Sequence, residues 1–236
     1  MDVYKAIWDG ALGSERRVWI TLRDTMVLLC IAIGLAPAFK MRFWNIGAEG
    51  QILVGGACAA AVMIYAGDSM SPVLLLIIMF VCSALGGMIW GMIPGVFKAY
   101  WNTNETLFTL MLNYIALYLI SFLRDGPWQD PNSSGFPKIA KFGEAAQLDK
   151  IFGVHAGWLI GLILVVIVYI YLKYTKQGYE ISVVGESRAT ANYAGMNYKK
   201  IVLRTMAFSG GICGIAGMVQ ASGSDLTLTT SVAGGV

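Results

Sequence analysis

The chain has 236 residues, of which 57% are hydrophobic and only 13% are charged, and its formal net charge is +3. A soluble domain carries roughly a quarter charged residues, so this composition excludes a soluble globular protein. The positive charge is spread along the chain without a basic block, which argues against a nucleic-acid partner. The composition therefore predicts an all-α, polytopic membrane protein in a lipid bilayer, with residues 1–236 forming one transmembrane domain.

Apolar runs follow one another along the chain. In chain order they cover residues 25–39, 52–67, 72–97, 106–123, 156–172 and 205–223. A helix needs roughly 20 residues to cross about 30 Å of hydrocarbon, so the first two runs must extend into polar flanks. The flank of the first contains Arg23 and Asp24, and that of the second contains Glu49. Charge is less costly near the membrane surface, so we expect six membrane-embedded helical segments.

The lysines and arginines indicate how these segments are oriented. Residues 173–204 are rich in them, so we expect this stretch to be a cytoplasmic loop. Alternation then places the loop at residues 124–155, where basic and acidic residues balance, outside the cell. It also places residues 1–17 outside, which would need another helix upstream, and residues 227–236 end in a run of small residues. We therefore expect the sequence to be an interior piece of a larger protein.

Motifs for chemistry are absent from the sequence. It has no phosphate-binding lysine loop, no metal-ligand spacing and no nucleophile–base pattern, so we expect no enzymatic activity, no cofactor and no metal. His155 is expected to be an interfacial residue at the outer end of a helix. The cysteines lie in apolar runs and are expected to act as core hydrophobes: Cys30, Cys58, Cys82 and Cys213. The tryptophans near predicted helix ends fit an aromatic belt: Trp90, Trp101, Trp128 and Trp158.

The run NIGAEGQ at residues 45–51 joins two apolar segments where a helix should be entering the lipid. Its glycines permit a break in the helix, and Asn45 is a candidate helix N-cap. An acid at membrane depth normally faces a cavity or a partner, so Glu49 marks a possible transport pathway. The alternative is an ordinary interfacial turn with Glu49 among the headgroups.

Glycines repeat every four residues at Gly87, Gly91 and Gly95, and Gly210 and Gly214 continue this pattern in the last segment. Small residues at this spacing let helices approach closely, so they are expected to serve helix packing rather than substrate contact.

An amide also lies inside an apolar run, where Asn113 precedes Tyr114 two turns after Asn104 and Glu105. A buried amide in a bilayer either joins neighbouring helices or lines a polar pore, and the spacing does not distinguish these.

The expected cytoplasmic stretch contains a short helix over residues 189–194 that ends at Gly195, a typical helix C-terminus. Such a helix can dock onto a partner protein or can simply connect two membrane segments.

Several of these motifs together resemble a known family. The strings FWNIGAEGQ (residues 43–51), NET and MLNY (residues 104–114), Gly185-Glu186 with Ala191 and Gly195, and FSGG with GIAG (residues 208–217) are similar to permease subunits of bacterial ABC importers. The branch is the simple-sugar, nucleoside and branched-chain amino acid group, and nucleoside-type permeases that work with lipoproteins are the most similar. The family's coupling motif begins with an acidic residue, where this chain has Ala189.

The resemblance implies a non-catalytic subunit that translocates nucleosides by alternating access. It implies a second permease subunit, two ATPase subunits that bind the ATP, and an external substrate-binding lipoprotein. The implied pathway residues are Asn45, Glu49, Gln51, Asn113 and Tyr114. The implied ATPase-coupling residues are Gly185, Glu186, Arg188, Ala191 and Gly195, with the two glycines as turns and Ala191 allowing close approach of the partner.

Other transporter classes are weaker fits. An ion-coupled secondary transporter should carry acids through the midplane, but Glu49 is the one candidate and the apolar runs themselves hold none. Within the ABC family, a monosaccharide such as ribose is the alternative substrate.

Overall fold

The chain folds into a bundle of long helices in the computed structural model, which describes residues 2–131, 133, 137–151 and 154–230. The longer helices are α1 (Asp2–Leu12), α2 (Glu15–Lys40), α3 (Ala48–Ala66), α4 (Pro72–Trp101), α5 (Glu105–Asp125), α6 (Gly157–Tyr174), α7 (Lys176–Glu186) and α9 (Tyr198–Val219). The shorter elements are helix α8 (Arg188–Tyr193), the single turns η1 (Gly67–Ser69), η2 (Glu144–Ala146) and η3 (Gln220–Ser224), and strands β1 (Lys150–Ile151) and β2 (Val154–His155). The last six residues of the run at 227–236 lie outside the described residues.

The predicted class of fold is confirmed. Within the described residues, six helices are long and apolar enough to cross a membrane: α2, α3, α4, α5, α6 and α9 with η3. Each covers one of the predicted apolar runs to within one residue, and the two short runs lengthen as expected into their polar flanks. Helix α2 begins after Ser14, whose side chain accepts a hydrogen bond from the Arg17 N–H.

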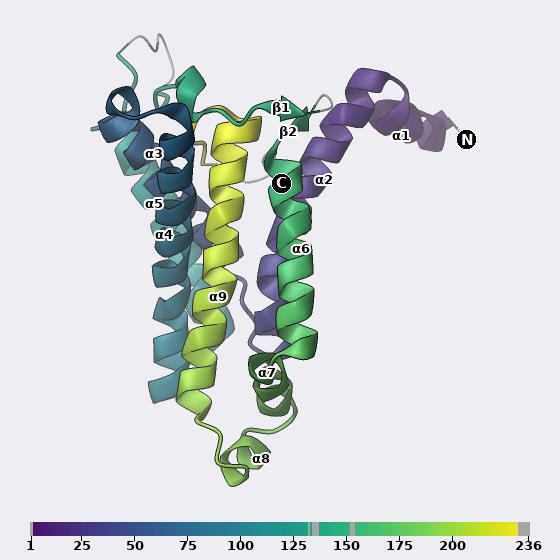
Figure 1. Cartoon of the computed structure of the whole chain (residues 1–236), viewed down its shortest axis with the longest axis vertical. Helices are drawn as coiled ribbons and strands as arrows, with labels where there is room; N and C mark the ends of the chain where they lie inside the picture. The colour runs from purple at the N-terminus through teal and green to yellow at the C-terminus, as the bar shows by residue number, and fades with distance from the viewer. Residues whose placement is uncertain (1, 132, 134–136, 152–153, 231–236) are drawn as a thin grey trace.

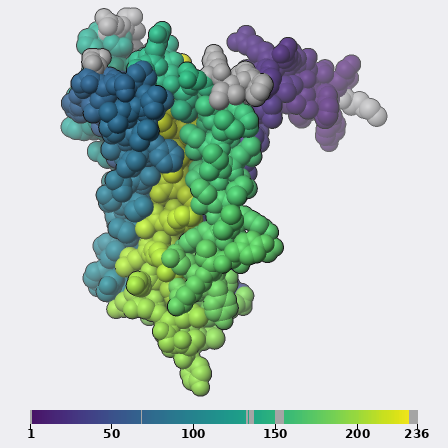
Figure 2. Space-filling model, viewed as in Figure 1, coloured from purple at the N-terminus to yellow at the C-terminus, as the bar shows by residue number. Residues whose placement is uncertain are grey.

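Helix α9 is the centre of the bundle. It packs against α4, α3 and α2, while α5 covers α3 and α6 covers α2. Figure 1 shows α3, α4 and α5 on one side of α9 and α2 with α6 on the other. In the space-filling view, α9 is visible only as a strip between these two groups (Figure 2).

The two ends of the bundle carry different elements. Helices α7 and α8 lie at one end, whereas the segment between α5 and α6, with the β1–β2 hairpin, lies at the other, beside the start of α2 (Figure 1). Three of these elements were not predicted, namely α1, α7 and the hairpin. Helix α9 begins at Tyr198, so the last residues of the expected loop at 173–204 belong to this helix.

Glycines bring α4 and α9 together. A Cβ atom on Gly87 would collide with the Gly210 carbonyl oxygen and the Gly214 backbone, and one on Gly214 would collide with the Ser83 carbonyl. A Cβ on Gly91 would lie 2.8 Å from the Met206 carbonyl oxygen, and one on Gly95 would lie 3.1 Å from the Met206 Cβ. The backbones at Gly87, Gly91 and Gly214 are therefore too close for a side chain, whereas at Gly95 the Met206 side chain would have to shift.

Candidate functional site

The segment before α3 turns back into the bundle and is held by its own amides. Asn45 and Gln51 are both buried, and their side-chain amides exchange two hydrogen bonds of 3.4 Å. The Asn45 Oδ1 atom also accepts from the Gly47 N–H at 3.0 Å. The predicted capping role of Asn45 is wrong, because α3 begins at Ala48 with Gly47 as N-cap. Asn45 instead fixes the turn that precedes the helix.

Asn113 joins this turn to α5. Its Oδ1 atom accepts from the Gly50 N–H at 2.8 Å, and its Nδ2 atom donates to the Ile46 carbonyl oxygen at 2.8 Å. The Thr109 hydroxyl accepts from the Ile46 N–H at 3.2 Å. Asn113 therefore acts on backbone groups at the start of α3 that the helix itself leaves unpaired.

The start of α3 lies deep in the bundle. A Cβ atom on Gly91 would lie 3.3 Å from Gln51 Nε2, so Gln51 packs at the level of Gly91 on α4. Gly91 precedes the end of α4 at Trp101 by ten residues, which is about 15 Å of helix. The polar residues at 45–51 thus meet α4 well inside a membrane-spanning helix.

Close packing explains the glycines of this motif. A Cβ on Gly50 would lie 2.9 Å from the Asn113 Oδ1 atom and 3.0 Å from the Trp90 indole nitrogen, and one on Gly47 would lie 3.0 Å from Thr109. The expected place of Trp90 in an aromatic belt is therefore wrong. Trp90 lies beside Gly50, and its buried indole N–H has no hydrogen-bond partner among the described residues.

Glu49 and Tyr114 differ from the other three predicted pathway residues because both are exposed. Tyr114 lies in a row of exposed side chains on α5: Leu107, Met111, Tyr114, Tyr118 and Phe122. The structure therefore brings Asn45, Gln51 and Asn113 into one buried network and leaves Glu49 and Tyr114 on the surface of the chain.

Helices α7 and α8 form a projection at one end of the bundle (Figure 1). The Ser187 hydroxyl caps α8 by accepting from the Thr190 N–H at 3.2 Å. At the other end of α8, Gly195 has a φ of +73°, and the Met196 N–H donates to the Ala191 carbonyl oxygen at 2.9 Å. This is the left-handed helix end expected at Gly195.

Two expectations for this projection are wrong. Gly185 does not form a turn but lies inside α7, where a Cβ would collide with the Lys40 carbonyl oxygen at the end of α2. Ala191 is fully buried within the chain, so its small side chain serves the packing of α8 on the bundle rather than the approach of a partner. The exposed residues of α8 include Arg188 and Tyr193, and Tyr193 is 97% exposed.

Ion pairs connect the elements at this end. Lys98 on α4 pairs with Glu105 on α5 at 2.7 Å, and Arg204 on α9 pairs with Glu180 on α7 at 2.8 Å. The carboxylate of Glu186 lies 3.7 Å from the Arg42 guanidinium, with both groups largely exposed. The projection is therefore tied by Glu180 to the central helix.

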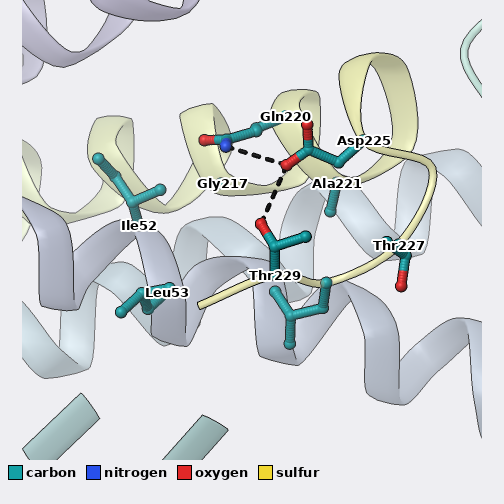
Figure 3. Close-up of a pocket in the computed structure, with 9 residues that line it drawn as sticks. Ile52, Leu53, Gly217, Gln220, Ala221, Asp225, Thr227 and Thr229 are labelled. Atoms are coloured by element: carbon teal, nitrogen blue, oxygen red, sulfur yellow. Dashed lines mark hydrogen bonds between the residues drawn. The ribbon is translucent and has the colours of Figure 1, made fainter. Parts of the chain in front are cut away.

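A small polar pocket lies toward the opposite end of α9, between the η3 turn and α3 (Figure 3). The Asp225 carboxylate accepts from Gln220 Nε2 and from the Thr229 hydroxyl, both at 3.1 Å. The volume of this pocket is about 10 Å³, which is room for about one water molecule and far too little for a nucleoside or sugar.

His155 lies just before the start of α6, at the helix end where it was expected, but it is buried within the chain. Its Nε2 atom lies 3.3 Å from the Ser224 hydroxyl, and the absence of a side chain at Gly223 makes room for the ring. Burial, with a smaller contribution from Arg23, lowers the pKa of His155 to about 4. The imidazole is therefore neutral at physiological pH.

Comparison with known proteins gives one family. Residues 18–232 match the family described as the branched-chain amino acid transport system / permease component. The guanosine ABC transporter permease protein of Bacillus subtilis is 31% identical over 94% of this chain and 64% of its own length. The glucose ABC transporter permease protein of Haloferax volcanii is 30% identical over 95% of this chain and 62% of its own.

A third relative is the nucleoside ABC transporter permease protein of Lactococcus lactis, which is 29% identical over 93% of this chain and 63% of its own. The chain thus spans slightly less than two thirds of the length of these relatives. No solved structure gives a significant match.

Proposed function

The chain belongs to the permease-component family and is a multi-pass protein of the cell membrane, and from this premise we propose that it forms the membrane pathway of an ATP-driven nucleoside importer. Two of the relatives described above are named for guanosine or nucleoside transport, at about 30% identity. In this proposal the chain catalyses no reaction itself. ATPase subunits, a second permease subunit and a substrate-binding lipoprotein complete the transporter.

The observation that carries the proposal is the exposed face of α5. Tyr114 lies nine residues from the start of α5 and eleven from its end, so its backbone is about 14 Å from the nearer end of the helix. Tyrosines that face lipid gather at the two membrane surfaces rather than at the middle. The exposed residues of α6, by contrast, are mainly aliphatic, including Leu162, Ile163, Val166, Ile167 and Ile170.

The face of α5 that carries Tyr114 and Tyr118 at this depth is therefore better suited to a substrate pathway than to lipid. A nucleoside offers a planar base and ribose hydroxyls, and Tyr114 can stack on the base while Glu49 accepts hydrogen bonds from hydroxyls. Asn45, Gln51 and Asn113 support this surface from behind, because they hold the start of α3, which carries Glu49, against α5.

The projecting helix α8 is proposed as the docking site for an ATPase subunit. Its two fixed ends, at Ser187 and Gly195, and the exposed Tyr193 suit a rigid contact with a partner. The Arg204–Glu180 pair connects α9 to α7, so movement of the projection would be transmitted directly to the central helix.

The orientation that this requires has α7 and α8 in the cytoplasm. Basic residues gather at their end of the bundle: Lys40, Arg42, Lys98, Lys173, Lys176, Arg188, Lys199, Lys200 and Arg204. Labelling of single cysteines in intact cells tests it. An impermeant reagent should label Ser133→Cys and leave Tyr193→Cys unlabelled, and the reverse result would invert the topology.

The uptake of labelled guanosine by cells that express the complete transporter tests the function. Unlabelled nucleosides should compete, and glucose and ribose should not. Tyr114→Ala should lower the uptake by about two- to tenfold, the effect of losing an aromatic stacking contact. Ile163→Ala on the aliphatic face of α6 is the matched control and should leave the uptake unchanged. Equal loss in both variants would refute the pathway assignment.

The second candidate is a sugar permease, which the similarity to the glucose permease of Haloferax volcanii favours. Uptake of labelled glucose by the same cells, with no uptake of labelled guanosine, would establish it.

A further inference from the structure

A groove lies beside the contact between α4 and α9, at the end of the bundle that carries α7 and α8. Its volume is about 350 Å³, and it is lined by Met92 and Tyr100 of α4, by Asn197, and by Lys199, Lys200, Leu203, Arg204 and Ala207 of α9. Both walls belong to helices long and apolar enough to cross a membrane. The groove therefore runs along these helices, from the membrane surface toward the membrane interior.

The chemistry of the lining changes along the groove. Its inner part is apolar, since Met92 lies nine residues, or about 14 Å, from the end of α4, and Ala207 lies nine residues from the start of α9. Its outer part is polar and basic, with Tyr100, Lys199 and Lys200 close to the helix ends. An apolar channel of this depth that opens onto cations matches a lipid molecule, which has an acyl chain below a charged headgroup.

The two lysines are available for an anion. The Lys199 ammonium lies 4.3 Å from the centre of the Tyr100 ring, and neither Lys199 nor Lys200 forms an ion pair with any residue that the structure describes. Lys98 and Arg204, at the same end, differ because they are already paired with Glu105 and Glu180. No acidic side chain lines the groove as described, so its mouth is positively charged.

We propose that this groove binds an anionic phospholipid of the cytoplasmic leaflet. The phosphate lies between Lys199 and Lys200, and one acyl chain lies along Met92, Leu203 and Ala207. Anionic lipids are enriched in that leaflet, and basic pockets between membrane helices bind their headgroups. The proposal rests on the orientation given above but not on the identity of the substrate.

A soluble phosphate is a poorer match than a lipid because it would leave the apolar half of the groove empty. The position of the groove also means that a bound lipid would contact the helices that join the bundle to the projection. It would lie alongside the contact between α4 and α9 near Gly95, because Leu203 both lines the groove and lies next to Gly95, and beside Arg204, which ties α9 to α7.

Native mass spectrometry of the purified transporter tests the proposal, with phosphatidylglycerol and phosphatidylcholine of identical acyl chains as probes. The wild type should retain phosphatidylglycerol in preference. Lys199→Gln/Lys200→Gln should weaken that binding roughly 30-fold, since each basic residue near the surface contributes about 1 kcal/mol to the attraction of anionic lipid. Lys173→Gln/Lys176→Gln removes the same charge at the same end, on α6 and α7, and should have no effect.

The apolar half needs its own variant. Leu203→Trp keeps both lysines but fills the groove, so it should displace the lipid, and Ala207→Leu is a milder version should that variant fail to fold. Equal retention of the two lipids, or equal loss in the lysine control, would overturn the proposal. Displacement of the lipid by inorganic phosphate together with insensitivity to Leu203→Trp would show a soluble-anion site instead. Loss of a partner subunit from Leu203→Trp with lipid retention unchanged would show that protein covers the groove.

Discussion

Asn113 is expected to be the main polar link between α3 and α5, and Asn113→Leu tests this at nearly constant volume. The variant removes two hydrogen bonds of 2.8 Å and leaves the Gly50 N–H and the Ile46 carbonyl without their partner. Interhelical hydrogen bonds in membrane proteins contribute on average about 0.6 kcal/mol each. A buried backbone group left unpaired costs about 1–3 kcal/mol. The expected loss of stability therefore lies between about 1 kcal/mol, for the two bonds alone, and about 6 kcal/mol, if both groups stay unpaired.

The measurement is the midpoint of thermal unfolding in detergent, followed by uptake in cells at equal expression. Asn113→Leu should lower both, because the start of α3, which carries Glu49, is no longer held against α5. The control is Ser121→Ala on the same helix, whose hydroxyl donates only to the Leu117 carbonyl one turn away. An unchanged midpoint for Asn113→Leu, or a fall equal to that of Ser121→Ala, would refute the role of Asn113 as a link between helices.

Three further predictions concern packing, the projection and pH. Gly210→Ala should destabilise the bundle because its Cβ would collide with the Gly87 carbonyl oxygen, whereas Gly211→Ala, with no contact closer than 3.6 Å, should be neutral or stabilising by up to about 1 kcal/mol in the same unfolding assay. Gly195→Val should reduce co-purification of the ATPase, since a β-branched residue at a φ of +73° is strained by about 1 kcal/mol or more, and normal co-purification with normal uptake would leave this stretch a connector. Because burial lowers the pKa of His155 to about 4 from an ordinary 6.5, only the unfolded chain takes up this proton between those values. Stability should therefore fall as pH decreases from 6.5 toward 4, and His155→Gln should flatten that part of the profile of unfolding midpoints.

The membrane-spanning helices could be predicted because each follows from a long run of uncharged, apolar residues. A run such as residues 72–97 has no charge, and no soluble fold can hide it, so its helix follows from length alone. Helix α7 and the β1–β2 hairpin were missed because neither is long or strongly periodic. Helix α7 depends on a tertiary contact, in which Gly185 packs against the end of α2, and such a contact leaves no local pattern in the sequence.

The sequence identified the polar residues of the candidate site, but it did not show which of them contact one another and which face outward. Asn45 and Gln51 lie six residues apart and bind each other, whereas Gly50 binds Asn113, 63 residues along the chain, and spacing alone cannot reveal such a pair. The glycines carried the missing information, because Gly47 and Gly50 are explained by the close approach of Thr109 and Asn113.

The motif at 45–51 contains residues that hold the fold and one residue that faces outward. Its amides and glycines make contacts inside the chain, and every one of these contacts serves to fix a helix that starts at depth. Glu49 is the one ionisable side chain in this motif, and it points out of the network. A substrate that contacts this surface would therefore depend on the amides only through the position of Glu49 and Tyr114. Substitution of Glu49 should change transport without changing stability, whereas substitution of Asn45 or Gln51 should change both together.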